Sequence, residues 1–93
     1  MSNKEEFYTK LKSQLEDTTS FPADYMYKFI VPSIENQVYE VQDLFNNKGA
    51  VINTKKSKTG KYISVSIVLK IKDAEEVILF YKKAENIKGI ISL

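Results

Sequence analysis

The sequence predicts an α+β domain in which two helices cover one face of a four-stranded antiparallel sheet, with a further helix at the N-terminus. Residues 60–71 alternate strictly between two sets of side chains and are rich in β-branched types, which is typical of a half-buried strand. Residues 33–47 and 73–87 instead repeat apolar side chains at helical spacing. These observations point to strands and helices that share one small core.

The strand at 60–71 is the longest and most aliphatic segment of the chain. We expect one face to carry Ile63, Val65, Ile67, Leu69 and Ile71. The other face carries Tyr62, Ser64, Ser66, Val68 and Lys70. A strand of this length with a fully aliphatic face needs partners at both edges and helices beneath it, so we place it at the centre of the sheet.

The N-terminal segment, residues 3–17, is predicted to be a helix with a thin apolar stripe made by Phe7, Leu11 and Leu15. Ser2 and Glu5 fit a capping box. We expect this helix to dock on the domain rather than to build its core. The domain boundary follows from this: residues 1–20 form the N-terminal helix and linker, and residues 21–93 form the domain.

The next strand is predicted at residues 25–31. Lysine is rarely buried, so we place Lys28 outward together with Met26 and Ile30. Tyr27, Phe29 and Val31 then point inward. Pro32 ends the strand, and Ser33 is the predicted N-cap of the helix at 33–47.

That helix is expected to bury a face formed by Ile34, Val38, Val41, Leu44 and Phe45. Its C-terminal signal is the run from Asn47 to Gly49. Residues 50–56 form a weaker strand, and residues 57–61 form a hairpin turn in which Gly60 takes positive φ.

The second helix, 73–87, is predicted to begin with Asp73 as its cap and Glu76 three residues later. We expect its buried face to contain Ala74, Val77, Ile78, Tyr81 and Ala84. Gly89 ends the helix, and residues 90–93 form a short final strand. The order strand, helix, strand, strand, helix, strand predicts a ferredoxin-like βαββαβ plait, which leaves one sheet face open.

Composition excludes several kinds of chemistry. The chain has no cysteine and no histidine, so disulfides, thiolate metal sites and the commonest general base are absent. No apolar run approaches the roughly 20 residues that span a bilayer, and we expect a cytoplasmic protein without a membrane segment. Charge is unevenly distributed, because residues 44–72 hold seven lysines and no acidic residue.

Three groups of residues, Phe21-Pro22, Tyr27-Lys28 and the hairpin residues from Ser57 to Ile67, resemble the YbeD-like family of small bacterial proteins of unknown function. The resemblance covers roughly residues 21–93. It implies a ferredoxin-like plait similar to the ACT-type regulatory domains. It implies no reaction, ligand or cofactor.

The hairpin concentrates positive charge in Lys55, Lys56, Lys58 and Lys61, with Tyr62 at its base. The run is not a P-loop, because Lys55 stands where that motif needs glycine and Tyr62 where it needs serine or threonine. Binding of RNA or DNA is an alternative, but the outward positions of the central strands offer one aromatic ring and no stacking platform. Lysines on an edge strand also prevent aggregation between sheets.

Lys28, Ser64 and Ser66 are predicted to form a polar row on the open face of the sheet. A serine beside a lysine is a possible nucleophile and base. Activation of such a pair needs burial, which an open face lacks, so a solvated or partner-facing surface is favoured.

Asp73, Glu75 and Glu76 form an acidic cluster, which helix capping explains better than a metal site does. We therefore expect a non-enzymatic regulatory or adaptor module without a cofactor. It would bind a protein partner or a small anionic metabolite through the hairpin lysines and the polar row. The open face is expected to be covered either by the N-terminal helix or by a second subunit of a homodimer.

Overall fold

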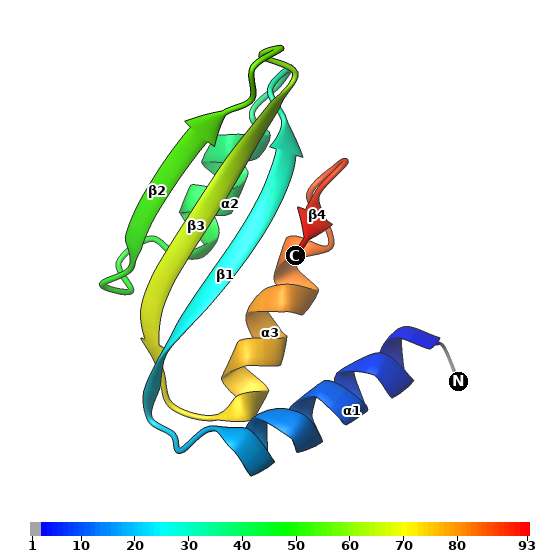
Figure 1. Ribbon diagram of the computed structural model, residues 1–93, viewed down its shortest axis with the longest axis vertical. Helices are drawn as coiled ribbons and strands as arrows, with labels where there is room; N and C mark the ends of the chain where they lie inside the picture. The colour runs from blue at the N-terminus through cyan, green and yellow to red at the C-terminus, as the bar shows by residue number, and fades with distance from the viewer. Residues whose placement is uncertain (1–2) are drawn as a thin grey trace.

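A computed structural model describes residues 3–93 of the chain. The elements are α1 (Asn3–Thr18), β1 (Ala23–Pro32), α2 (Gln37–Leu44), β2 (Val51–Lys56), β3 (Tyr62–Ile71), α3 (Ala74–Ala84) and β4 (Ile91–Ser92). The strands form one sheet in the order β2-β3-β1-β4, and each neighbouring pair is antiparallel. Helices α2 and α3 lie on one face of the sheet (Figure 1). The predicted element order is confirmed, and the arrangement is consistent with a ferredoxin-like plait.

Strand β3 occupies the central position that its length predicts. It pairs with β1 over ten residues, from Ala23 opposite Ile71 to Pro32 opposite Tyr62. Ile67 lies opposite Tyr27 on β1 and Ile52 on β2. Four of the five predicted inward residues of β3 are buried and Ile63 is half-buried, which confirms the predicted alternation.

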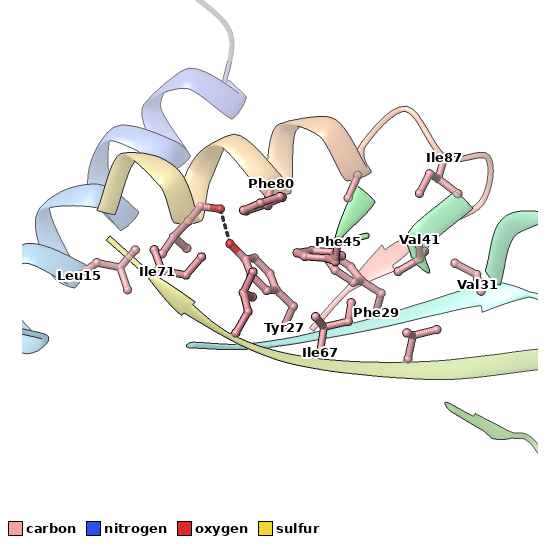
Figure 2. Packing of buried hydrophobic residues seen from close by; sticks show 14 of the residues in the cluster. Leu15, Tyr27, Phe29, Val31, Val41, Phe45, Ile67, Ile71, Phe80 and Ile87 are labelled. Carbon is pink, nitrogen blue, oxygen red and sulfur yellow. Dashed lines mark hydrogen bonds between the residues drawn. The ribbon is translucent and has the colours of Figure 1, made fainter. Parts of the chain in front are cut away.

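Aromatic rings from β1, from α3 and from the residue that follows α2 fill the space between the sheet and the helices (Figure 2). Tyr27 stacks on Phe29 with ring centroids 5.7 Å apart, and Phe45 stacks on Phe80 at 4.7 Å. The Tyr27 hydroxyl donates to the Val77 carbonyl at 2.9 Å, so its buried polar atom is satisfied. Phe80 was not among the predicted core residues of its helix, although it is buried.

The prediction that a helix begins at Ser33 is wrong. Strand β1 continues to Pro32, and the Ser33 N–H donates to the Lys61 carbonyl at 3.0 Å while its hydroxyl donates to the Gly60 carbonyl. Ser33 therefore joins the end of β1 to the hairpin and is not a helix cap. Helix α2 begins four residues later, which leaves Ile34 outside the helix and 76% exposed.

The first residue of α2 is Gln37, and its side chain is buried. Gln37 Oε1 accepts a hydrogen bond from the Glu35 N–H at 3.1 Å, so a side-chain amide stabilises the turn before the helix. The helix ends at Leu44, three residues before the predicted end at Asn47. Asn47 and Gly49 both have positive φ and reverse the chain toward β2.

Helix α3 begins as predicted. The Glu76 N–H donates to Asp73 Oδ1 at 2.8 Å, which satisfies one of the free donors of the first turn. The helix ends at Ala84 instead of residue 87, and β4 has two residues instead of the predicted four. Gly89 takes positive φ, and a Cβ there would lie 2.8 Å from Cγ of Pro32, so this close turn requires glycine.

Helix α1 packs against α3 and does not cover the open face of the sheet. The alternative in which the N-terminal helix covers this face is therefore wrong. Lys12 Nζ lies 2.8 Å from Glu75 Oε1, and the Tyr8 hydroxyl donates to Glu85. Leu15 is the buried residue of the stripe, whereas Phe7 is 62% exposed. The predicted capping box involves Ser2, which lies outside the described residues. Within residues 3–93, no helix has the length and apolar character to cross a membrane.

Candidate anion-binding surface

The sheet face directed away from α2 and α3, hereafter the open face, is organised in rows across the strands. Residues opposite each other in antiparallel strands point to the same side, so the register defines each row. The first row is apolar and consists of Met26, Val68 and Val51. The second is polar and consists of Lys28, Ser66 and Asn53. The third is mixed and consists of Ile91, Ile30, Ser64 and Lys55. Figure 1 looks onto this face.

A hollow of about 260 Å³ lies over the two polar rows. Its lining contains the side chains of Lys28, Asn53, Lys55, Ser64 and Ser66, with Leu93 at its border and no acidic residue. Ammonium, hydroxyl and amide groups all donate hydrogen bonds, and two of these side chains carry positive charge. The open-face hollow therefore has the chemistry to bind a carboxylate or a phosphate.

Exposed apolar side chains flank this hollow. Met26 and Val51 are 55% and 61% exposed in the row on one side, and Ile91 is 50% exposed in the row that ends on β4. Isolated exposed apolar residues are normal, but several on one face of a sheet mark an interaction surface. The open face thus has a polar centre flanked by exposed apolar side chains, whereas the centre of a typical protein interface is apolar.

The predicted binding residues fall into two groups. Lys28, Ser64 and Ser66 lie together with Lys55 around the hollow, as the predicted polar row requires. Lys56 lies opposite Ile63 and so points to the helix side of the sheet. Lys58 and Lys61 lie in the turn, away from the hollow, and Tyr62 lies at the base of the hairpin and is 47% exposed.

The hairpin turn itself is well ordered by hydrogen bonds. The Ser57 N–H donates to the Tyr62 carbonyl at 2.8 Å, and the Gly60 N–H donates to the Ser57 carbonyl at 3.0 Å. Gly60 has a φ of 75°, which confirms the predicted positive φ. Lys58 and Lys61 are therefore presented to solvent on a defined turn, tied to the end of β1 through Ser33.

Asn53 and Leu93 were not predicted as site residues. Asn53 occupies the position between Ile52 and Thr54, so the alternation of the predicted strand already places it on the outer side. Its position beside Ser66 depends on the register between β2 and β3. Leu93 reaches the hollow because its N–H donates to the Lys28 carbonyl at 2.9 Å. No local signal in the sequence indicates that contact.

The acidic residues at the start of α3 have structural partners. Besides the Asp73 cap, Glu76 Oε1 accepts from the Lys72 N–H at 3.0 Å. Glu75 pairs with Lys12, and this hydrogen bond raises the pKa of the Lys12 ammonium. Among residues 3–93, no group of three or more histidine, cysteine or acidic side chains is arranged to hold a metal ion.

The sequence from residue 16 to residue 93 matches the model of the DUF493 family, described as a protein family of unknown function. This match covers most of the chain, and the chain belongs to that family. The resemblance noted from the hairpin and the first strand is thereby confirmed at the level of the family. Neither a curated protein nor a solved structure matches the chain significantly.

Proposed function

We propose that this member of the DUF493 family is a small, cytoplasmic, non-enzymatic regulatory or adaptor module that binds an anionic group on its open face. The anion is a carboxylate or phosphate carried by a protein partner or by a small metabolite. One observation carries the proposal: Lys28 and Lys55 lie with Ser64, Ser66 and Asn53 around one hollow that has no acidic residue in its lining. Two lysine side chains and several hydrogen-bond donors, with no aspartate or glutamate among the lining residues, favour an external anion.

Binding is a better account of these residues than catalysis. Ser64 is exposed and Ser66 is half-buried, and both lie on an open surface beside Lys28. A lysine activates a serine when burial removes its proton, and an open face provides no such burial. The family resemblance implies a plait similar to ACT-type regulatory domains, and a regulatory role and a homodimer would both fit such a plait.

A second candidate function is weak, non-specific binding of RNA or DNA by the hairpin. The observation in its favour is that the side chains of Lys55, Lys56, Lys58 and Lys61 are all exposed. The observation against it is that Tyr62 is the one aromatic side chain on the open face within the described residues, so bases would lack a stacking platform.

The proposal is tested by titrating inorganic phosphate and glutarate into the protein and following backbone amide shifts by nuclear magnetic resonance. We expect the largest shifts at Asn53, Ser64 and Ser66. Lys28→Gln is expected to weaken binding at least threefold, because it removes one of two charges at the hollow. Lys10→Gln, which replaces an exposed lysine on α1, is the matched control and should bind as the unmodified protein does.

Shifts confined to residues 57–62, or an equal effect of both substitutions, would contradict the open-face site. A single-stranded oligonucleotide serves as the second ligand. Two results together would replace the proposed anion binding with nucleic-acid binding by the hairpin. The oligonucleotide would bind more tightly than either anion, and its affinity would fall with salt at a log–log slope of about −0.7 per neutralised phosphate.

A further inference from the structure

Strand β1 has neighbours of very different length on its two sides. On one side β3 pairs with it from Ala23 to Pro32. On the other side β4 pairs with it only at Phe29 and Ile30, and Leu93 adds one hydrogen bond to the Lys28 carbonyl. Figure 1 shows β4 beside only one end of β1. Within the described chain, residues 23–27 of β1 therefore have no strand along this side, hereafter the free edge.

The backbone of the free edge is directed to receive a strand. The Lys28 carbonyl points toward the β4 side, since it accepts the Leu93 N–H. Backbone polar groups of alternate residues in a strand point the same way, so the N–H and C=O groups of Met26 and Asp24 point out of this edge too. No strand of the described chain lies opposite these two residues.

Side chains on both sides of the free edge are incompletely covered. On the open face the Met26 side chain is 55% exposed. On the helix side Tyr25 and Tyr81 are half-buried, and their hydroxyls lie 2.9 Å apart. A strand placed along the edge would cover Met26 with one set of its side chains and the two tyrosines with the other.

The free edge also lacks the lysine and proline residues that often protect a sheet edge, and Asp24 is its one charged residue. At the other end of the sheet, β2 carries Lys55 and Lys56, which discourage the approach of another strand. Residues 23–27 contain no lysine and no proline, and their pairing with β3 runs without a bulge. A less protected edge, on a sheet whose opposite edge carries two lysines, indicates a binding surface.

We infer that the free edge of β1 binds an extended segment of a partner protein, which adds a strand antiparallel to β1 in line with β4. This inference rests on the proposed function, because Lys28 supplies the charge that selects the segment. The partner residue opposite Met26 lies diagonally beside Lys28 on the open face and is acidic. The partner residues opposite Tyr25 and Tyr27 face the helices and are apolar. The residue opposite Asp24 is not acidic.

The probe that represents this segment is the blocked peptide Val-Glu-Val-Thr-Val, in which the glutamate lies opposite Met26 and the central valine opposite Tyr25. In the free protein the N–H groups of Asp24 and Met26 should exchange rapidly with solvent. With the peptide present we expect their hydrogen exchange to slow and their amide signals to shift. The signals of residues 57–62 should change least.

Two modified peptides test the strand pairing directly. The glutamate N–H would donate to the Met26 carbonyl, so methylation of that nitrogen should weaken binding at least tenfold. The central valine N–H would point away from β1, so methylation there is the matched control and should leave binding within about twofold. Equal affinities of the two methylated peptides would overturn the inference, because binding would then not use the backbone.

A pair of protein variants gives a second test. Met26→Pro removes the N–H that faces the edge without removing a bond to β3, and it should abolish peptide binding. Met26→Thr keeps this N–H and should retain peptide binding. Both variants are compared by circular dichroism first. If Met26→Pro does not fold, the methylated peptides alone decide.

Failure of this inference is distinguishable from failure of the proposed function. If the methylation pattern holds but Lys28→Gln changes neither peptide nor phosphate binding, the edge binds strands and the anion proposal fails. If phosphate binds through Lys28 but no peptide protects Asp24 and Met26, the edge inference fails alone. If the two amides become protected in concentrated protein without peptide, together with a doubled mass, the occupant is a second copy and the assignment to a partner peptide is overturned.

Discussion

The two faces of β3 differ in what determines them. On the helix face Ile67 lies between Tyr27 and Ile52, is fully buried, and belongs to the continuous core. On the open face the adjacent Ser66 lies between Lys28 and Asn53 and is half-buried. One face is therefore specified by packing and the other by the polar groups it presents. The fold therefore depends on the helix face and leaves the open face available for binding.

The largest expected effect comes from removing part of the helix face. Ile67→Ala should lower the free energy of unfolding by about 2–5 kcal/mol, because the lost methyl and methylene groups leave a cavity in a packed core. Ser66→Ala, its neighbour on the open face, is the matched control and should change it by less than about 0.5 kcal/mol. Urea denaturation measures both. Similar losses for the two variants would remove the distinction between the faces.

A smaller effect is expected where α3 is held over the helix face. Asp73→Ala removes the side chain that accepts the Glu76 N–H and should lower the free energy of unfolding by about 1 kcal/mol. Asp73→Asn keeps an acceptor oxygen and should recover much of the loss. Urea denaturation again provides the measurement. A loss that asparagine does not reduce would assign the role of Asp73 to charge rather than to capping.

The helix face should also make stability sensitive to alkaline pH. Burial raises the pKa of the Tyr27 and Tyr81 phenols above the ordinary tyrosine value of 10.0. The native state then keeps protons that the unfolded state loses, so stability is fully present below pH 10 and falls as the pH rises above it. In Tyr81→Phe this alkaline loss should be smaller than in the unmodified protein. Thermal unfolding of the variant and of the unmodified protein is measured at pH 8 and above pH 10. An equal loss of stability in the two proteins would contradict the assignment to Tyr81.

The smallest effect on stability is expected from the hairpin. Replacing Lys55, Lys56 and Lys58 with glutamine should leave the free energy of unfolding unchanged or slightly higher, because crowded lysines repel one another. The same replacement should slow association with an acidic ligand, most clearly at low salt. Stopped-flow measurements at two salt concentrations test this.

Two single substitutions separate the lysines at the hollow from those of the turn. Lys56→Gln should have less effect on glutarate binding than Lys55→Gln, since only Lys55 of these two lines the hollow.

Local sequence patterns determined the order of the elements and the buried face of the central strand β3. Alternation in residues 60–71 required a half-buried strand, and Asp73 with Glu76 marked the start of α3. Patterns of this kind act over a few residues, so they are readable without knowledge of the rest of the chain. The choice of Ser33 as a cap failed because its partners, Gly60 and Lys61, lie far along the chain.

Tertiary structure decided the features on which function depends. The open-face hollow exists because the register brings Asn53 of β2 and Lys28 of β1 to opposite sides of Ser66. The free edge exists because β4 is two residues long while β1 has ten. Helix α1 docks on α3 through Lys12 and Tyr8, whose partners are 63 and 77 residues away along the chain. Pairing between distant segments fixes each of these features, and a local pattern of apolar and polar residues does not encode such pairing.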